Sequence, residues 1–147
     1  MECQLVWLDS MNQEHLDLRF RVLRIGMPRG TEHYPKVDND SRTKFLCAYV
    51  NEKMVGCSTL QVDSREGCKY RIRGMAVDSE YRNKGIGSKI VNELQRIAEE
   101  EKTGIWCNPR IKAVRCMQDV AFKLFLIFLK LKISGLIMIW NGDKGIR

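Results

Sequence analysis

A basic, glycine-containing turn is the segment whose residue types most directly suggest chemistry. It spans residues 82–88 (RNKGIGS), between a predicted strand over residues 72–77 and a predicted amphipathic helix. One face of that helix carries the apolar residues Ile86, Ile90, Leu94, Ile97 and Ala98. Glycines let a backbone approach a ligand closely, and the N–H groups of a helix's first turn lack intrahelical partners and sit at the positive end of its dipole. The turn therefore predicts a phosphate-binding site.

Two well-known phosphate loops do not match this turn. The P-loop requires Gly-Lys-Ser/Thr after a longer glycine spacing, whereas here Lys84 precedes Gly85. The dinucleotide-binding fingerprint requires a third glycine three residues after the second, and Ile90 occupies that position. The segment does match Arg/Gln-x-x-Gly-x-Gly/Ala, with a strand before it and a helix after it.

This arrangement resembles the central motif of the GCN5-related N-acetyltransferase (GNAT) family over residues 73–88 (RGMAVDSEYRNKGIGS), and the wider resemblance covers residues 18–112. It implies an α/β (α+β) fold with a mixed, mostly antiparallel central sheet flanked by helices. A single domain over residues 1–147 is expected, atypical from about residue 114. The implied activity is acetyl-CoA-dependent N-acetyl transfer to a primary amine of a small molecule or a protein, by direct transfer.

The resemblance also implies where acetyl-CoA, the co-substrate, binds. Backbone groups at the end of the central strand would hydrogen-bond the pantetheine amides and polarise the thioester carbonyl. The N–H groups of the turn would hold the pyrophosphate, with charge added by Arg82 and Lys84 and a hydroxyl donor by Ser88. The expected cofactor-binding residues are Met75, Ala76, Val77, Arg82, Asn83, Lys84, Gly85, Ile86, Gly87, Ser88 and Asn108.

A general base is harder to identify. Members of the family often use a Glu or a water chain, and Glu32, His33 and Asp40 lie in the segment that usually covers the acceptor site. Glu66 lies in the turn before the central strand. His33 has an intrinsic pKa near the working pH, yet a histidine in a loop is more often simply solvated. Together with Cys116, the weak catalytic candidates are Glu32, His33 and Glu66, and the acceptor amine is not identified.

The chain departs from the family pattern beyond Ala113. Met117 stands where the family usually has a Tyr, and it has no proton to give to the leaving thiolate. The adjacent Cys116 is a substitute acid in principle, but an apolar-facing thiol is more often structural. General acid–base assistance is typically worth about 10²–10⁴-fold. The alternative to an active enzyme is therefore a non-catalytic or weakly active acyl-CoA-binding GNAT-like protein.

Composition narrows the class of protein. A chain of 147 residues with 44% hydrophobic residues suits one domain with a single core. The formal net charge of +7 comes from scattered basic residues without a nucleic-acid motif, and coenzyme A is itself a polyanion, so no nucleic-acid partner is expected. The N-terminus lacks a signal-peptide pattern, which makes the cytoplasm the expected location.

The C-terminal segment 123–132 is unusually apolar, but three lysines interrupt it, and no apolar run approaches the ~20 residues that span a bilayer. A buried strand or helix, as at a homodimer contact, is favoured over membrane association. The six cysteines lack Cys-x-x-Cys pairs, and only His15 and His33 could join them as ligands. Reduced thiols on strands and no metal are therefore expected.

The predicted elements must position these residues. Leu16, Phe20, Leu23 and Met27 recur at helical spacing and predict a helix over residues 12–25. Residues 26–36 read as a loop, or a loop with a short helix. The remaining predictions are strands over 43–50 and 54–62, a turn over 64–68, a strand over 69–77, a helix over 85–102 stopped by Gly104, and strands over 105–107 and 136–140.

Overall fold

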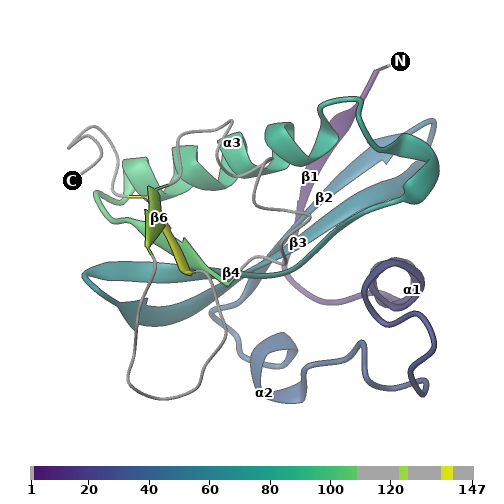
Figure 1. Ribbon diagram of the computed structural model, residues 1–147, viewed down its shortest axis with the longest axis horizontal. Helices are drawn as coiled ribbons and strands as arrows, with labels where there is room; N and C mark the ends of the chain where they lie inside the picture. The colour runs from purple at the N-terminus through teal and green to yellow at the C-terminus, as the bar shows by residue number, and fades with distance from the viewer. Residues whose placement is uncertain (1, 109–122, 126–136, 141–147) are drawn as a thin grey trace.

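The computed structural model describes residues 2–108, 123–125 and 137–140. A seven-stranded mixed sheet runs through them in the order β1-β2-β3-β4-β5-β7-β6, with β4 and β5 parallel and the other neighbours antiparallel. Helix α3 covers one face of the sheet, and α1 and α2 lie on the other (Figure 1), which confirms the predicted fold class. The elements are β1 Gln4–Leu8, α1 Gln13–Leu23, α2 Pro35–Asp38, β2 Lys44–Val50, β3 Lys53–Arg65, β4 Cys68–Val77, the 3₁₀ turn η1 Ser79–Tyr81, α3 Ile86–Glu100, β5 Ile105–Cys107, β6 Lys123–Phe125 and β7 Ile137–Trp140.

Helix α3 fits closely against the centre of the sheet. Its apolar face, predicted from the sequence, is buried against β2, β3 and β4 in the larger of two core clusters. Gly56 on β3 makes this approach possible, since a Cβ there would lie 2.9 Å from Ile90 Cδ1 and 3.1 Å from Ile86 Cγ2. The close contact fixes the first turn of α3 relative to the neighbouring strand β4.

Helix α1 begins and ends close to the prediction. Asn12 caps the helix by accepting a hydrogen bond from the His15 N–H at 2.8 Å. The buried residues are His15, Leu18 and Arg19, whereas Met27 lies beyond the helix and is 47% exposed. Leu16, Phe20 and Leu23, whose spacing predicted the helix, are half-buried beside this set. Arg19, a charged residue inside the helix, is fully buried.

The buried Arg19 guanidinium is held by partners from three other segments. Its two terminal nitrogens donate to the two carboxylate oxygens of Asp38 at 2.8 and 3.0 Å. They also donate to the Glu32 carbonyl at 2.9 Å and to the Thr59 hydroxyl. The Tyr34 ring lies 4.2 Å from the guanidinium carbon. A paired and hydrogen-bonded charge can be buried where an isolated one cannot, so this network joins α1, α2 and β3.

Most of the other predicted elements are confirmed with shifted ends. Strand β3 extends to Arg65, because Glu66 and Gly67 take positive φ values of 50° and 78° and close a tighter hairpin than predicted. Helix α3 stops at Glu100, and Lys102 rather than Gly104 takes the left-handed conformation, at φ 56°. Strands β5 and β7 correspond to the predictions for 105–107 and 136–140.

Strand β1 was not predicted, because its five residues form a half-buried edge strand with only partial apolar alternation. Among the described cysteines, Cys3, Cys47 and Cys57 are free thiols, as expected. Within the same segments, no helix is long and apolar enough to cross a membrane.

The Arg19–Asp38 pair gives a stability prediction. Asp38→Asn removes the charge that compensates a fully buried guanidinium, and breaking such a pair from one side costs about 3–5 kcal/mol. Urea unfolding at neutral pH should show this loss in the free energy of unfolding. Asp40→Asn is the matched control, because Asp40 pairs with the exposed Arg42, and it should leave that free energy almost unchanged. Equal effects of the two substitutions would contradict the assigned role of Asp38.

His15 gives a second, pH-dependent prediction. Burial, and next the charge of Arg19, lower the pKa of His15 from 6.5 to about 3, and its Nε2 atom has no hydrogen-bond partner among the described residues. Below pH 6.5 the imidazole of His15 binds a proton in the unfolded chain but not in the folded chain. The free energy of unfolding therefore falls by up to about 1.4 kcal/mol per pH unit, until about pH 3. Denaturant midpoints measured from pH 7 to pH 4 should fall less steeply for His15→Leu than for the unmodified chain. Parallel curves would show that His15 does not titrate in this way.

Candidate functional site

The turn that follows β4 is anchored at its start by Asp78. The Asp78 N–H donates to the Val55 carbonyl at 2.8 Å, and its carboxylate accepts from the Glu80 N–H at 3.1 Å and from Arg21 at 2.8 Å. Burial alone would raise the pKa of Asp78, but the hydrogen bonds from Arg21 and Glu80 outweigh it and lower the pKa. The carboxylate is therefore ionised at neutral pH, and it ties η1 to β3 and α1.

The next residues form the start of α3, which has no side-chain cap for its first N–H groups. Asn83 and Gly85 both take left-handed conformations, at φ 60° and 79°. Gly85 is the N-cap of α3 and has no side chain to accept the N–H groups of the first turn, and the first intrahelical bond runs from the Lys89 N–H to the Gly85 carbonyl at 3.0 Å. Left-handed residues at the positive end of a helix turn successive backbone N–H groups into an anion-binding concavity.

Basic side chains surround this turn. Arg82, Asn83 and Lys84 are exposed, and the Arg82 Nε atom donates weakly to the Val77 carbonyl at 3.4 Å. The Nζ atoms of Lys84 and Lys53 lie 5.4 and 5.5 Å from the centre of the Tyr81 ring. The exposed Glu80 is a nearby carboxylate, so positive charge is in excess at the end of β4.

Strands β4 and β5 separate next to this turn. Their parallel pairing covers only residues 70–72 of β4 with residues 105–107 of β5. Beyond Ile72, β4 continues to Val77 with β3 on one edge and no strand on the other within the described residues. The backbone groups on that open edge are available to an extended ligand, since backbone N–H and C=O groups need partners.

A β-bulge marks the point of separation. Cys57 pairs with Ala76 and Thr59 with Arg73, so two residues of β4, Gly74 and Met75, oppose one residue of β3. The bulge reverses the alternation of side chains. Gly74 has a φ of 52°, and a Cβ there would lie only 2.8 Å from Arg19 Nε. The glycine thus lets the Arg19 network lie directly against the open part of β4.

The predicted cofactor-binding residues fall into three groups around this opening. Residues 75–77 form the open end of β4, and residues 82–88 form the turn and the first turn of α3. Asn108 is exposed and follows β5, on the other side of the separation. Ile86 is only 2% exposed and its side chain belongs to the core, so its part in ligand binding is limited to its backbone.

Two of the catalytic candidates lie beside the Arg19 network. The carboxylate of the buried Glu32 accepts from the Gly30 N–H at 2.8 Å, which assigns it a loop-closing contact. The side chain of His33 is 37% exposed, and its Nε2 atom lies 3.8 Å from an Asp38 carboxylate oxygen. These two are therefore close to the α1 side of the opening.

The other candidates are placed elsewhere. The Asp40 carboxylate is paired with Arg42 at 2.8 Å, and this hydrogen bond lowers its pKa to about 2. Glu66 is exposed in the β3–β4 turn, at the end of β4 opposite the phosphate-binding turn. Cys116 and Met117 lie outside the described residues.

The sequence argument missed Arg19 and Asp38. The available signal was a charged residue next to Leu18, inside an amphipathic helix, with an acid in the segment that follows.

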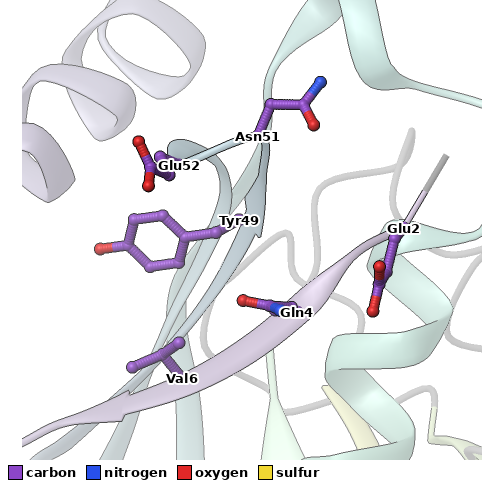
Figure 2. A pocket seen from close by; sticks show the side chains of 6 residues that line it. All are labelled: Glu2, Gln4, Val6, Tyr49, Asn51 and Glu52. Atoms are coloured by element: carbon purple, nitrogen blue, oxygen red, sulfur yellow. The ribbon is translucent and has the colours of Figure 1, made fainter.

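A separate depression of about 530 Å³ lies at the β1 edge of the sheet (Figure 2). It is open to solvent and does not coincide with the turn or with the separation of β4 and β5, because β2 and β3 lie between β1 and β4. Two carboxylates at its margin also make it unsuitable for a phosphate. Its lining residues are Glu2, Gln4, Val6, Tyr49, Asn51 and Glu52.

Comparison with known proteins agrees with this geometry. One similar solved structure is a GNAT-family acetyltransferase from Staphylococcus aureus Mu50, with a TM-score of 0.73 and 18% identity over 95% of this chain and 99% of that chain. A second is an acyl-CoA N-acyltransferase from Pseudomonas aeruginosa, with a TM-score of 0.72 and 16% identity over 94% of this chain and 99% of that chain. A third is an aminoglycoside 6'-N-acetyltransferase complexed with coenzyme A, with a TM-score of 0.73 and 10% identity over 92% of this chain and 94% of that chain. At these identities the likeness shows the fold. No curated protein matches the chain in sequence. The model of the acetyltransferase (GNAT) family matches residues 8–122, and the chain belongs to that family.

Proposed function

We propose that this single-domain chain is an acetyl-CoA-dependent N-acetyltransferase that moves an acetyl group directly to a primary amine. The observation that carries the proposal is the open edge of β4 beyond Ile72, adjacent to the anion-binding turn at the start of α3. An extended ligand with amides at one end and a diphosphate at the other matches both features. Family membership and the coenzyme A bound by the aminoglycoside acetyltransferase support this assignment.

In the proposed complex, backbone groups make most of the contacts. The edge formed by residues 75–77 hydrogen-bonds the pantetheine amides and the thioester carbonyl, while the N–H groups of residues 83–88 surround the pyrophosphate. Arg82 and Lys84 add positive charge from exposed positions. Preorganised donors of this kind stabilise charge without having to reorient during the reaction.

Direct transfer is favoured because two buried thiols on the α1 side of the sheet, those of Cys47 and Cys57, are poor nucleophiles. Burial raises the pKa of Cys47 to about 12 and raises that of Cys57 further. A thiol needs to ionise before it attacks a thioester, so neither is poised to form an acetyl-enzyme. The amine nitrogen instead attacks the thioester carbonyl, a C–N bond forms, and the C–S bond breaks to release coenzyme A. His33 is the best-placed of the predicted candidates to accept the ammonium proton, because the Glu32 carboxylate already accepts a backbone N–H.

Coenzyme A binding is tested by a charge placed in the first turn of α3. Gly87→Asp puts a carboxylate where the diphosphate is proposed to bind, and we expect the dissociation constant for coenzyme A to rise at least tenfold. Titration calorimetry measures this directly. An acidic residue near a helix N-terminus is itself stabilising by about 0.3–1 kcal/mol, so the loss should occur without a lower melting temperature. Asn92→Asp adds the same charge to an exposed position further along α3 and should bind normally. Equal affinities for all three proteins would refute the placement of the diphosphate.

Transfer is tested with a panel of primary amines. We expect thiol release from acetyl-CoA that depends on the amine, with the acetylated amine identified by mass spectrometry. Intact-protein mass after incubation with acetyl-CoA alone should show no acetyl-enzyme, because the buried thiols are protonated. A stoichiometric acetyl-cysteine would instead indicate a covalent route. Tight coenzyme A binding without transfer to any amine would favour the non-catalytic acyl-CoA-binding alternative.

A further inference from the structure

A row of polar side chains crosses the sheet immediately before β4 and β5 separate. Gln61 on β3 pairs in register with Arg71 on β4, which pairs with Trp106 on β5. Thr59 and Arg73 form the next row, and the Thr59 hydroxyl accepts from Arg19 of α1. By strand alternation, both rows lie on the face that α1 and α2 share, opposite α3. A sheet face under helices normally buries apolar residues, so this polar strip requires an explanation.

The strip carries more positive than negative charge. Arg71 and Arg65 lie over the Trp106 ring, with their guanidinium carbons 4.5 and 5.1 Å from its centre. Arg73 lies 5.2 Å from the centre of the Tyr34 ring. In the described part of the chain, one carboxylate faces these three guanidinium groups, that of Asp63, at 3.5 Å from Arg71. The local charge therefore favours an anion.

Two buried atoms in the same row lack hydrogen-bond partners within the described segments. They are Arg71 Nε, a donor, and Gln61 Oε1, an acceptor, on directly opposed residues. Leaving such groups unpaired away from water is destabilising. Burial, and next the charge of Arg73, lower the pKa of Arg71, although a guanidinium remains charged at any physiological pH. A ligand with an anionic acceptor and an N–H donor would satisfy both atoms.

Resting on the proposed function, we propose that the acceptor is an amine that carries a carboxylate, bound through Arg71. The planar guanidinium matches a carboxylate in a fork geometry, and Arg73 adds charge at the neighbouring position. Gln61 accepts an N–H of the same molecule. Because the β4–β5 pairing ends one residue beyond Arg71, a carboxylate held there leaves the amine of a short acceptor close to the open edge of β4. Polycationic amines are repelled by the same charges.

The test compares acceptors that differ in one group. Acetyl transfer is measured for glycine and β-alanine, for their carboxamides, and for putrescine, with kcat/KM corrected for the fraction of unprotonated amine. We expect the carboxylates to exceed the carboxamides and putrescine at least tenfold. Arg71→Gln should raise KM for the carboxylates at least tenfold and remove the preference, while KM for acetyl-CoA stays the same. Arg71→Lys, which keeps the charge without the fork, should be intermediate.

Arg96→Gln is the matched control, because Arg96 is exposed on α3 and pairs with Glu93 and Glu100. It should change neither KM. Carboxamides or putrescine that react as well as the carboxylates would overturn the inference and leave the proposed function intact. If no amine is acetylated, titration of the coenzyme A-loaded protein with β-alanine tests the carboxylate site without relying on catalysis. Binding that weakens tenfold in Arg71→Gln supports the carboxylate site, and absent or unchanged binding refutes it.

Discussion

The arrangement of the site depends on one buried interaction, the pairing of Arg19 with Asp38. The two terminal nitrogens of the guanidinium donate to four protein acceptor atoms from three segments. Because the partners come from the loop before α2, from α2 and from β3, the charge pair positions the segment that carries Glu32 and His33. Hydrophobic contacts alone are non-directional, whereas a forked charge pair specifies one orientation of α1 over the sheet.

The same guanidinium lies against the bulge in β4, and this contact connects the two halves of the opening. Gly74 has no Cβ, so Arg19 approaches the backbone of β4 just beyond Ile72, the last residue paired with β5. The extra residue of the bulge changes which side chains face α3. Met75 and Val77 pack against the larger core cluster, together with Tyr70 and Ile72, while Ala76 packs with Leu18 on the α1 side. The open edge of β4 is therefore rigidly supported from both faces of the sheet.

Local patterns in the sequence were enough to predict the strand, turn and helix that carry residues 82–88, because their conformation depends on neighbouring residues only. The basic residues, Gly85 and the apolar stripe of α3 all lie within one short segment. The burial of Arg19 in α1 was not predictable from the sequence, for the opposite reason. The burial of Arg19 depends on Asp38 and Thr59, which lie 19 and 40 residues away in the chain, and no spacing rule within a helix reports partners at such distances. The bulge at Gly74 was likewise hidden, since register is a property of two strands.

The two faces of the opening differ in the kind of group they offer, and this difference explains how one fold can serve many acceptors. On the α3 side, the turn and the β4 edge present backbone N–H and C=O groups, which most substitutions leave unchanged. On the α1 side, the strip is made of the side chains of Gln61, Arg71 and Trp106. Substitutions on these strands change the charge and shape of that surface without disturbing the ladder beneath it. In the complex we propose, the acyl donor is bound mainly by backbone groups and the acceptor by side chains, and in this chain those side chains form an arginine-rich surface that favours an anion.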